Sequence, residues 1–497
     1  MSDPLTPAQL MAQFIEQIGT DLPAPTVSAT DPFFTYDRPP TFGVHAEQIE
    51  IPMNDGGFLT GELHRPATPD GDPAPGPFPG IVFEFNGYDA VQFFAAGAGH
   101  FVTRGYIVVV CNVRGTGGSP GTVDPFGPQE QKDNAELIEW LAALPFCTGK
   151  VGQMGVSYGG HNSLLAAVNA PEHLTTVIAV QAFSDWYENT IYRGGIANAQ
   201  IRDWQRDTAP ETLQTYPQHP LYDEYWKDRS VKARWDRLRI PVLDVGGWLD
   251  PYRLGMVENF RARPEQTWMV AGPWSHGMVP GQFEDIGAAA YLAWLDYWLS
   301  DLPGALPQAR VTSYEMPREG WRQYADWPPP ESRPVTFVLA SGGRLLPGES
   351  ATGESTVSTF DVSTGSLVFE TEPGQADLVI AGELKADVRL AFSASDGNVA
   401  VVLEEVDKDG ASTRITNGWL RASHRDGSAG LAAVEPGDEY VLSVTLWPAH
   451  HRLLAGHRLR VTLSSRDFPL IDDNAPDGTV SVRLGDNGSS LSLQALR

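Results

Sequence analysis

The chain of 497 residues contains few cysteines and few basic residues for its length. Two cysteines, Cys111 and Cys147, exclude a disulfide-stabilised scaffold and a cysteine-rich zinc site. Cys111 lies inside an apolar stretch, so we expect it to be a buried free thiol. Lysine and arginine number 35 against 62 acidic residues, which gives a net charge of −27. Such a surface is soluble and repels phosphate backbones and anionic lipids, which argues against nucleic-acid and membrane partners.

Several signals of other protein classes are also missing. No apolar run approaches the length that spans a bilayer. The first residues lack a basic segment followed by an apolar core, so we expect no signal peptide and a cytoplasmic protein. The zinc motif His-Glu-x-x-His does not occur, and the stretch 407–410 lacks the remaining ligands of a calcium loop. We therefore expect no metal and no cofactor, while the oligomeric state stays open.

The length and the hydrophobic patterns indicate several domains. A chain of this size exceeds one hydrophobic core. Between 80 and 299, fully apolar runs alternate with helical patterns, which is typical of a parallel sheet covered on both faces. A helix is also predicted at 7–18, and irregular structure in the proline-rich stretch 301–334. The predicted domains are an α/β core at 1–183 and 238–310, a mostly helical cap insertion at 184–237, a linker at 311–334, and an all-β sandwich or jelly roll at 335–497.

The stretch 151–160 carries the most specific motif of the chain. Gly155, Ser157 and Gly159 form Gly-x-Ser-x-Gly between an apolar run and a predicted helix at 162–170. This strand–turn–helix context predicts a nucleophile elbow, in which Ser157 occupies a strained turn and glycines avoid steric collisions. The serine oxygen then lies beside the positive end of a helix. The alternative is a glycine-rich turn with an incidental serine.

Candidate partners for Ser157 follow two later predicted strands. In an α/β-hydrolase sheet the acid and then the histidine come after Ser, on loops at the carboxyl ends of strands. Asp250 follows the apolar run 240–245, and His276 follows the run 267–271. We predict that His276 is the base and that Asp250 orients it. Asp244 competes for the acidic role, but its mid-strand position directs it into an apolar layer, and His161 is expected on a helix surface.

The oxyanion of an acyl-transfer reaction needs two hydrogen-bond donors. One is predicted to be the backbone N–H of Tyr158, directly after the nucleophile. The other should come from the loop 86–89, either from the Tyr88 hydroxyl or from a backbone N–H. The residues alone give equal weight to two interpretations of Tyr88: an oxyanion donor, or a loop aromatic that packs on the sheet edge.

With these motifs placed, the chain resembles the cocaine esterase family, which is similar to α-amino acid ester hydrolases and X-prolyl dipeptidyl peptidases. The resemblance runs from about residue 46 to the C-terminus. It implies an α/β-hydrolase core, a helical cap and a C-terminal jelly roll, and it implies that the Tyr88 hydroxyl faces the oxyanion. The chain departs from the family in its cap, which is short, and in Gly87, where members tend to have proline. The matching stretches are 87–89, 113–119, the elbow, 247–250, 272–276, 417–422, 446–448, 455–461 and 464–469.

Three functions are consistent with the sequence, two of them hydrolases and the third from another class. The first is a serine hydrolase that cleaves small-molecule carboxylic esters through an acyl-enzyme. The second is an X-Pro dipeptidyl peptidase or an α-amino acid ester or amide hydrolase, which needs cap carboxylates to bind a substrate amine. The third is a binding protein with a vestigial hydrolase, which a large separation of Ser157 from His276 would support. The candidate cap carboxylates are Asp185, Glu188, Asp203 and Asp207.

Overall fold

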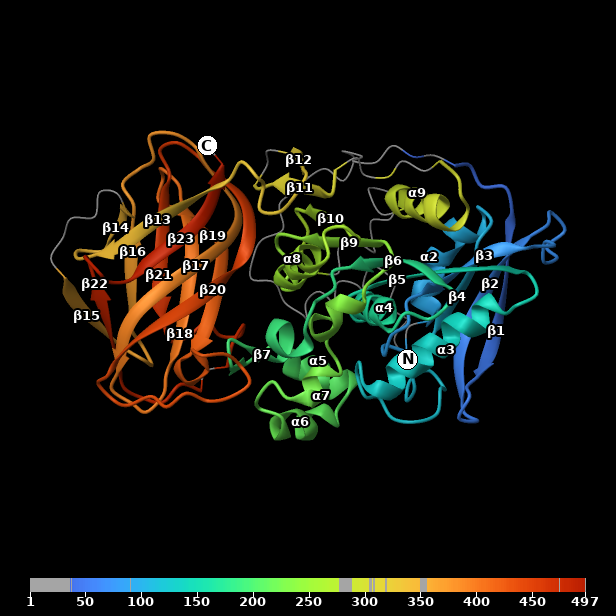
Figure 1. The fold of residues 1–497 in the computed structure, drawn as a ribbon, viewed down its shortest axis with the longest axis horizontal. Coiled ribbons are helices and arrows are strands. Elements are labelled where there is room, and N and C mark those ends of the chain that lie inside the picture. Colours follow the sequence, from blue (N-terminus) through green and yellow to red (C-terminus); the bar gives the residue numbers. More distant parts are fainter. Residues whose placement is uncertain are drawn as a thin grey trace, which may run out of the picture. The chain divides into compact units, whose positions relative to one another are not determined.

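The computed structural model describes residues 36, 38–89, 91–276, 288–303, 306, 309–317, 320–348, 355–472 and 474–496. The helix predicted at 7–18 lies outside these residues. The chain divides into two compact units (Figure 1). The predicted domain boundaries stay a prediction. The two units divide the chain in another way, since each unit contains parts of the stretch 184–237. The first unit comprises Met1–Trp186, Asp203–Tyr216 and Glu224–Thr312, and the second comprises Tyr187–Arg202, Pro217–Asp223 and Ser313–Arg497.

The first unit, which we call the hydrolase unit, is built on a mostly parallel sheet. The eight strands of this sheet that lie wholly within the hydrolase unit follow the order β1-β2-β4-β3-β5-β6-β9-β10. Pairing is antiparallel from β1 to β4 and parallel from β4 to β10, as the apolar runs predicted. The bounds are β1 (Gly43–Pro52), β2 (Phe58–Ala67), β3 (Phe78–Phe83), β4 (Ile107–Cys111), β5 (Cys147–Val156), β6 (Leu174–Val180), β9 (Val242–Gly247) and β10 (Thr267–Gly272).

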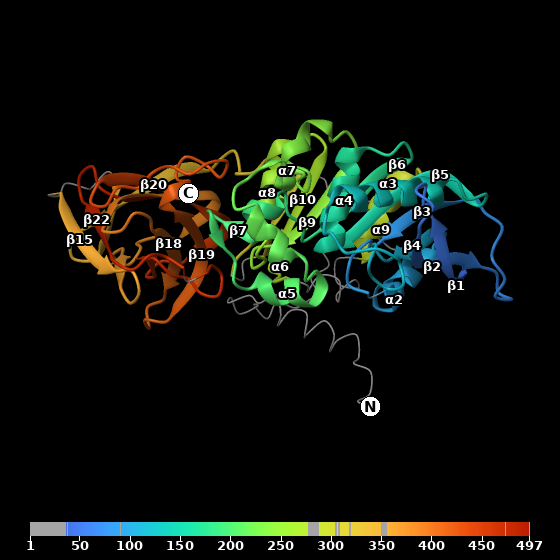
Figure 2. The ribbon, with the colours of Figure 1, turned by 90° about the horizontal axis from the view of Figure 1, so that it is seen from below.

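Helices cover this sheet because fully apolar strands expose two faces that must be buried. In both ribbon views α3 and α4 lie side by side (Figure 1 and Figure 2). The helix α4 is buried almost throughout, which explains why its polar residues do not mark a solvent face. The helices are α2 (Val91–Val102), α3 (Pro128–Ala142), α4 (Tyr158–Asn169), α8 (Arg253–Ala262) and α9 (Ala288–Leu299).

The insertion between β6 and β9 consists mainly of short helical pieces, as predicted. Its parts are divided between the two units, so α5 belongs largely to the hydrolase unit while the preceding hairpin belongs to the second unit. Its elements are a π-helical turn (Tyr187–Ile191), β7 (Tyr192–Arg193), β8 (Ile196–Ala197), α5 (Ile201–Thr208), α6 (Thr212–Thr215), α7 (Glu224–Lys227) and two 3₁₀ turns (Tyr216–Gln218 and Lys232–Arg237).

The second unit, which we call the β unit, is an all-β domain whose strands alternate between a buried and a solvated face. Its longest pair is β17 with β20, drawn in orange and red in Figure 1. The strands are β12 (Gly320–Tyr324), β13 (Arg333–Ala340), β14 (Arg344–Pro347), β15 (Thr356–Asp361), β16 (Ser366–Glu370), β17 (Leu378–Phe392), β18 (Asn398–Val406), β19 (Ser412–Arg421), β20 (Glu439–Leu453), β21 (Arg458–Ser464), β22 (Thr479–Leu484) and β23 (Ser490–Leu496).

Two expectations about the chain before and within the β unit are wrong. The stretch 301–334 is not irregular throughout, because it contains β11 (Val311–Glu315) and β12. The alternating runs 377–383 and 388–393, which the sequence pattern predicts as two strands, form one strand, because β17 continues through a register shift between Gly382 and Leu384. A β-bulge lets one strand pass the glycine at which the alternating pattern is interrupted.

Among the residues that the structure describes, no helix has the length and apolarity needed to cross a membrane. The cytoplasmic location stays a prediction. Cys111 is a buried free thiol on β4, as expected.

Candidate active site

Ser157 lies on a sharp turn between β5, which ends at Val156, and α4, which begins at Tyr158. Its φ of 57° and ψ of −109° lie outside the ordinary strand and helix regions. Neighbouring backbone leaves no space for side chains beside it: a Cβ at Gly155 would lie 2.6 Å from the carbonyl carbon of Gly159, and one at Gly160 would lie 2.6 Å from the Val180 oxygen. Glycine therefore permits the turn that presents the serine.

The structure brings the three predicted triad side chains into one hydrogen-bonded chain. His276 Nε2 lies 2.9 Å from Ser157 Oγ, and His276 Nδ1 lies 2.8 Å from Asp250 Oδ2. Ser157 follows β5, Asp250 follows β9 and His276 follows β10, which are parallel strands whose carboxyl ends share one edge of the sheet. The large separation that would have supported a binding protein with a vestigial hydrolase is absent between these residues.

Both carboxylate oxygens of Asp250 accept hydrogen bonds, and the side chain is buried. Its second oxygen, Oδ1, accepts a hydrogen bond of 2.6 Å from the backbone N–H of Tyr252. The Tyr252 ring packs edge-to-face on His276, with centroids 5.0 Å apart. Asp250 and His276 are each 1% exposed, so little water competes for the hydrogen bond between them.

The loop after β3 places Tyr88 beside the serine. The Tyr88 hydroxyl lies within hydrogen-bonding range of the side chains of Ser157 and Trp204, and burial raises its pKa above the usual value. The loop is held by the Tyr88 backbone N–H, which donates to Asn86 Oδ1 over 3.1 Å. Tyr158, the other predicted oxyanion residue, is the first residue of α4, where backbone N–H groups have no intrahelical acceptor. Both roles stay predictions.

The side chain of Tyr158 has a second function in the packing of the site. Its hydroxyl donates a hydrogen bond of 2.6 Å to Glu130 Oε2 on α3. Glu130 also accepts a hydrogen bond of 2.8 Å from Asn162 Nδ2, and burial raises the pKa of Glu130 to about 7. Sequence reasoning missed Glu130, because a lone acidic residue in the first turn of a helix is ordinarily solvated.

Aromatic side chains form a wall near the nucleophile. The Tyr158 ring lies 4.4 Å from Phe126, 5.7 Å from Tyr88 and 6.3 Å from Trp204, measured between ring centroids. Trp204 on α5 continues to Trp186, with centroids 5.4 Å apart. All five rings belong to the hydrolase unit. Two tryptophans of the insertion, Trp186 and Trp204, therefore belong to the surroundings of the elbow.

The four candidate cap carboxylates have different surroundings. Asp203 and Asp207 on α5 are exposed, and Asp203 pairs with Arg206 over 2.7 Å. Asp185 is fully buried and accepts 2.6 Å from Ser230 Oγ. Glu188 belongs to the β unit.

His161 and Asp244, the alternatives to the predicted base and acid, are both buried and hydrogen-bonded to other groups. His161 is not on a helix surface as predicted; it is fully buried, with its ring nitrogens 2.8 Å and 3.0 Å from the carbonyl oxygens of Phe183 and Arg229. Burial is the main cause that lowers the pKa of His161 to about 4. Asp244 is buried on β9 and accepts 3.3 Å from Asn259 Nδ2, and burial raises its pKa well above the usual value.

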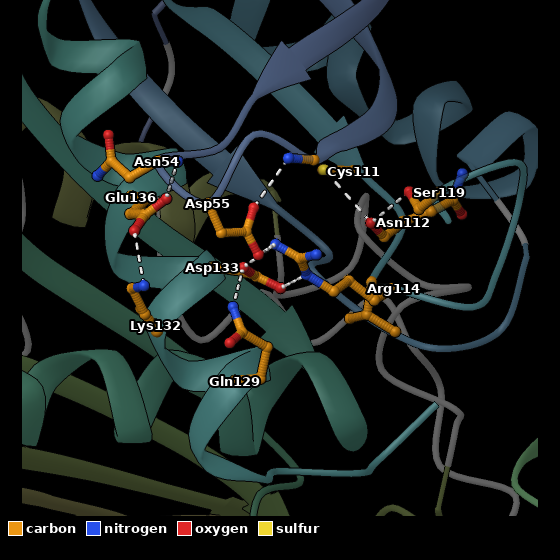
Figure 3. A network of polar contacts seen from close by, with 12 residues as sticks. Asn54, Asp55, Cys111, Asn112, Arg114, Ser119, Gln129, Lys132, Asp133 and Glu136 are labelled. Atoms are coloured by element: carbon orange, nitrogen blue, oxygen red, sulfur yellow. Dashed lines mark hydrogen bonds and ion pairs between the residues drawn. The ribbon is translucent and has the colours of Figure 1, made fainter. Parts of the chain in front are cut away.

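The stretch 113–119 contains an arginine, Arg114, whose ion pairs connect α3 with the turn between β1 and β2; we call this connection the brace. Figure 3 shows Arg114 between two carboxylates, with Nε 2.5 Å from Asp133 Oδ2 and Nη2 2.8 Å from Asp55 Oδ2. Asp133 lies on α3 and Asp55 in the turn between β1 and β2. The brace extends towards the site because the Val113 N–H donates to the Asn86 carbonyl over 3.1 Å, in the loop that leads to Tyr88.

Among the described residues, no group of three or more histidine, cysteine, aspartate or glutamate side chains is placed to hold a metal ion. The arrangement brings together a serine hydroxyl, an imidazole within hydrogen-bonding distance of it and a carboxylate, which are the groups that serine acyl transfer uses.

Comparison with known proteins assigns the chain to a family. The family model described as X-Pro dipeptidyl-peptidase (S15 family) matches residues 19–208 and 199–278, together more than half of the chain. The chain belongs to the S15 family. The model of the X-Pro dipeptidyl-peptidase C-terminal non-catalytic domain matches residues 304–492. The predicted resemblance is confirmed, and so is the prediction that this chain is a hydrolase enzyme, because S15 relatives are serine esterases and peptidases.

Named relatives and solved structures agree with this assignment. The S15 chain is 25% identical to the cocaine esterase of Rhodococcus sp. strain MB1 Bresler, over 88% of this chain and 93% of the relative. A CocE/NonD family hydrolase from Staphylococcus aureus aligns with a TM-score of 0.81 at 18% identity, covering 94% of this chain and 100% of that one.

An aminopeptidase from the marine sediment archaeon Thaumarchaeota archaeon aligns with a TM-score of 0.79 at 20% identity, covering 95% of this chain and 100% of that one. At these identities the structures show the fold alone. That fold is an α/β hydrolase with a C-terminal β domain, so the predicted fold class is confirmed.

Proposed function

We propose that this S15 hydrolase cleaves carboxylic esters through an acyl-enzyme on Ser157. The observation that carries the proposal is the unbroken chain of hydrogen bonds from Asp250 through His276 to Ser157, with distances of 2.8 Å and 2.9 Å. This is the arrangement that activates a serine hydroxyl, because an oriented imidazole within 3 Å can accept its proton.

Acylation would begin when Ser157 Oγ attacks the ester carbonyl carbon and His276 Nε2 takes the hydroxyl proton. The carbonyl π electrons move onto oxygen and form a tetrahedral oxyanion. When this intermediate collapses, the bond to the alcohol oxygen breaks, and His276 returns the proton to the departing alcohol. Asp250 keeps the Nδ1 proton in place and stabilises the imidazolium without becoming protonated.

Deacylation repeats these steps with water. His276 removes a proton from a water molecule, whose oxygen attacks the acyl carbon, and Ser157 leaves with that proton. The products are a carboxylic acid, an alcohol and the original enzyme. The oxyanion of both steps would be bound by the Tyr88 hydroxyl and the Tyr158 backbone N–H, and each such donor is typically worth ~3 kcal/mol of transition-state stabilisation.

The surroundings of the site favour an uncharged acyl group. The wall of Phe126, Tyr158, Trp186 and Trp204 offers apolar and aromatic surface within the hydrolase unit. Exposed carboxylates such as Asp203 and Asp207 are solvated and therefore bind an ammonium group weakly.

The second candidate is an X-Pro dipeptidyl peptidase or an α-amino acid ester or amide hydrolase. It is supported by the description of the matching family. The same serine, histidine and aspartate would serve, because amide and ester cleavage share the acyl-enzyme chemistry. This candidate needs an ammonium site formed by carboxylates other than the exposed pair on α5.

A matched pair of chromogenic assays separates the two candidates. Wild type and Ser157→Ala would be measured with a short-acyl or benzoyl p-nitrophenyl ester and with a free-amino X-Pro p-nitroanilide. We expect turnover of the ester by wild type alone. Turnover of the anilide at comparable kcat/KM would establish the peptidase instead, and full activity of the variant on either substrate would refute Ser157 as the nucleophile.

A further inference from the structure

Glu84 is a buried carboxyl group at the elbow that the proposed reaction does not use. It follows the last residue of β3, has a φ of 58° and is 3% exposed. A non-glycine residue in the left-handed region carries backbone strain, which surrounding contacts must hold in place. The prominent feature in the sequence is an ionisable residue inside the otherwise apolar run 80–85.

The side chain of Glu84 joins the two segments that carry Ser157 and Tyr88. Its Oε1 accepts a hydrogen bond of 2.8 Å from the backbone N–H of Val156, the residue before the nucleophile. Its Oε2 accepts a hydrogen bond of 3.4 Å from Asn86 Nδ2. The Oδ1 atom of the same asparagine accepts a hydrogen bond from the backbone N–H of Tyr88. One carboxyl group therefore connects the elbow with the loop of the predicted oxyanion donor.

The carboxyl group also lies directly against the first turn of α4. A Cβ at Gly159 would be 2.4 Å from Glu84 Oε2, closer than any side chain permits. A side chain at the last glycine of the Gly-x-Ser-x-Gly motif would therefore have to displace this carboxyl group. The Glu84 backbone N–H adds a further bond of 2.9 Å to the Met154 carbonyl on β5.

We propose that Glu84 is a positioning residue of the proposed ester hydrolysis, whose hydrogen bonds hold the Tyr88 loop and the Ser157 elbow at a fixed separation. The inference rests on the proposed function. It adds a requirement for the neutral form: a carboxylate at this place would oppose the negative charge that develops on the substrate oxygen nearby.

Burial of the Glu84 carboxyl group favours its neutral form. Burial is the main cause that raises its pKa to about 8, against the hydrogen bonds from Val156 and Asn86. The titratable groups that interact with it electrostatically are Tyr88 on its own loop and Tyr291 on α9, and burial raises the pKa of both. Among the described residues, no cation contributes to the pKa of Glu84.

The pH dependence of kcat tests this inference. Wild type should lose activity on the alkaline side with an apparent pKa near 8, so kcat at pH 9 should be roughly a tenth of its plateau value. Glu84→Gln keeps the shape and the acceptor for Val156 but cannot ionise. We expect its ratio of kcat at pH 9 to kcat at pH 7 to rise about tenfold over the wild-type ratio, with KM changed less than kcat.

Glu130→Gln is the matched control, because it makes the same replacement at the other buried carboxyl near the elbow. We expect this variant to retain the fall near pH 8. A wild-type kcat that stays constant to pH 9.5, a fall that persists in Glu84→Gln, or a fall that disappears in Glu130→Gln would each overturn the inference.

Covalent labelling separates a failure of this inference from a failure of the proposed function. Diethyl p-nitrophenyl phosphate would be attacked by Ser157 Oγ, with loss of p-nitrophenolate and transfer of the serine proton to His276. We expect mass spectrometry to find the label on Ser157, with an alkaline fall in labelling rate for wild type but not for Glu84→Gln. An unlabelled wild type would contradict the proposed function and this inference with it, whereas identical pH profiles would contradict the inference alone.

Discussion

Each unit of this S15 hydrolase contains a serine, a histidine and a carboxylate in proximity. In the hydrolase unit these are the predicted triad residues. In the β unit, Ser313 Oγ lies 2.8 Å from His450 Nδ1, and His450 Nε2 lies 3.8 Å from Glu315 Oε2. Ser313 and His450 are fully buried. The second cluster has a longer distance between histidine and carboxylate, 3.8 Å against 2.8 Å, and the two clusters differ further in the backbone and in the competing partners.

The backbone distinguishes the two serines. Ser157 has a φ of 57° and directly precedes α4, so helix N–H groups face the space beside its oxygen. Ser313 lies inside the regular strand β11, whose neighbours are extended on both sides. A strand offers its N–H groups to the sheet ladder, so the cluster around Ser313 has no comparable site for an oxyanion.

The carboxylates differ in what they bind. Asp250 accepts from His276 and from one backbone N–H. Glu315 binds Arg452 over 2.6 Å and Arg322 over 3.4 Å. Burial, followed by the charge of Arg322, lowers the pKa of His450 to about 3. A base this weak is a poor proton acceptor, so side-chain proximity alone does not make a nucleophile.

The largest expected effect concerns the two serines. Ser157→Ala should reduce kcat for a p-nitrophenyl ester by at least about 10⁴-fold, since the nucleophile and its base act as a unit. Ser313→Ala is the matched control and should change kcat by less than twofold. Steady-state kinetics of both purified variants would measure this, and equal losses would contradict the distinction drawn between the units.

The carboxylates give the next largest effect. Asp250→Asn should lower kcat by roughly 10³–10⁴-fold, because the amide no longer fixes the imidazole tautomer. Glu315→Gln should instead lower the melting temperature, as it leaves Arg452 and Arg322 without their charged partner. Parallel measurements of kcat and thermal unfolding would show the two effects on different readouts. A loss of kcat without loss of stability in Glu315→Gln would contradict this division.

Tyr88→Phe should have a smaller effect than either triad change. Removing one oxyanion donor typically reduces kcat by about 10²–10³-fold, with a lesser effect on KM. Tyr297→Phe on α9 is a suitable control, because Tyr297 is 42% exposed. If kcat for Tyr88→Phe stayed within threefold of wild type, Tyr88 would be a packing residue of the loop, which the sequence left equally open.

The sequence predicted which residues lie together when they directly follow strands of the parallel sheet. Parallel strands end at one edge of a sheet, so residues directly after β5, β9 and β10 had to lie near one another. This placed Ser157, Asp250 and His276 without any knowledge of their separations. The same reasoning located the Tyr88 loop after β3, although the residues alone did not decide what its side chain contacts.

Contacts between distant segments could not be predicted from local patterns. Trp204 reaches Tyr88 from the insertion, and no spacing rule links the two. His161 was expected on a surface because a polar residue on a helix is usually solvated, whereas α4 is buried almost throughout. Glu84 did leave a signal, since a carboxyl group inside an apolar run requires a buried hydrogen-bonding role.

Titration of buried groups should make the two units respond differently to acid. The pKa of His450 in the β unit is lowered to about 3, so the unfolded chain binds its proton more tightly. Its contribution to stability is present above pH 6.5 and is lost as the pH falls towards 3. In the hydrolase unit His161 acts in the same direction, but Glu84 and Glu130, with pKa values raised to about 8 and 7, oppose it. Their contribution is present below pH 4.5 and is lost as the pH rises.

Lowering the pH from 7 to 5 should therefore destabilise the β unit more than the hydrolase unit. Hydrogen–deuterium exchange, corrected for the intrinsic pH dependence of amide exchange, would report the opening free energy of peptides from β17 and β20 against those from β5 and α4. We expect a decrease on the order of 1–3 kcal/mol in the β unit. His450→Gln, which cannot titrate, should remove much of that decrease. An equal decrease in both units, unaffected by this variant, would mean that His450 does not couple pH to the stability of the β unit.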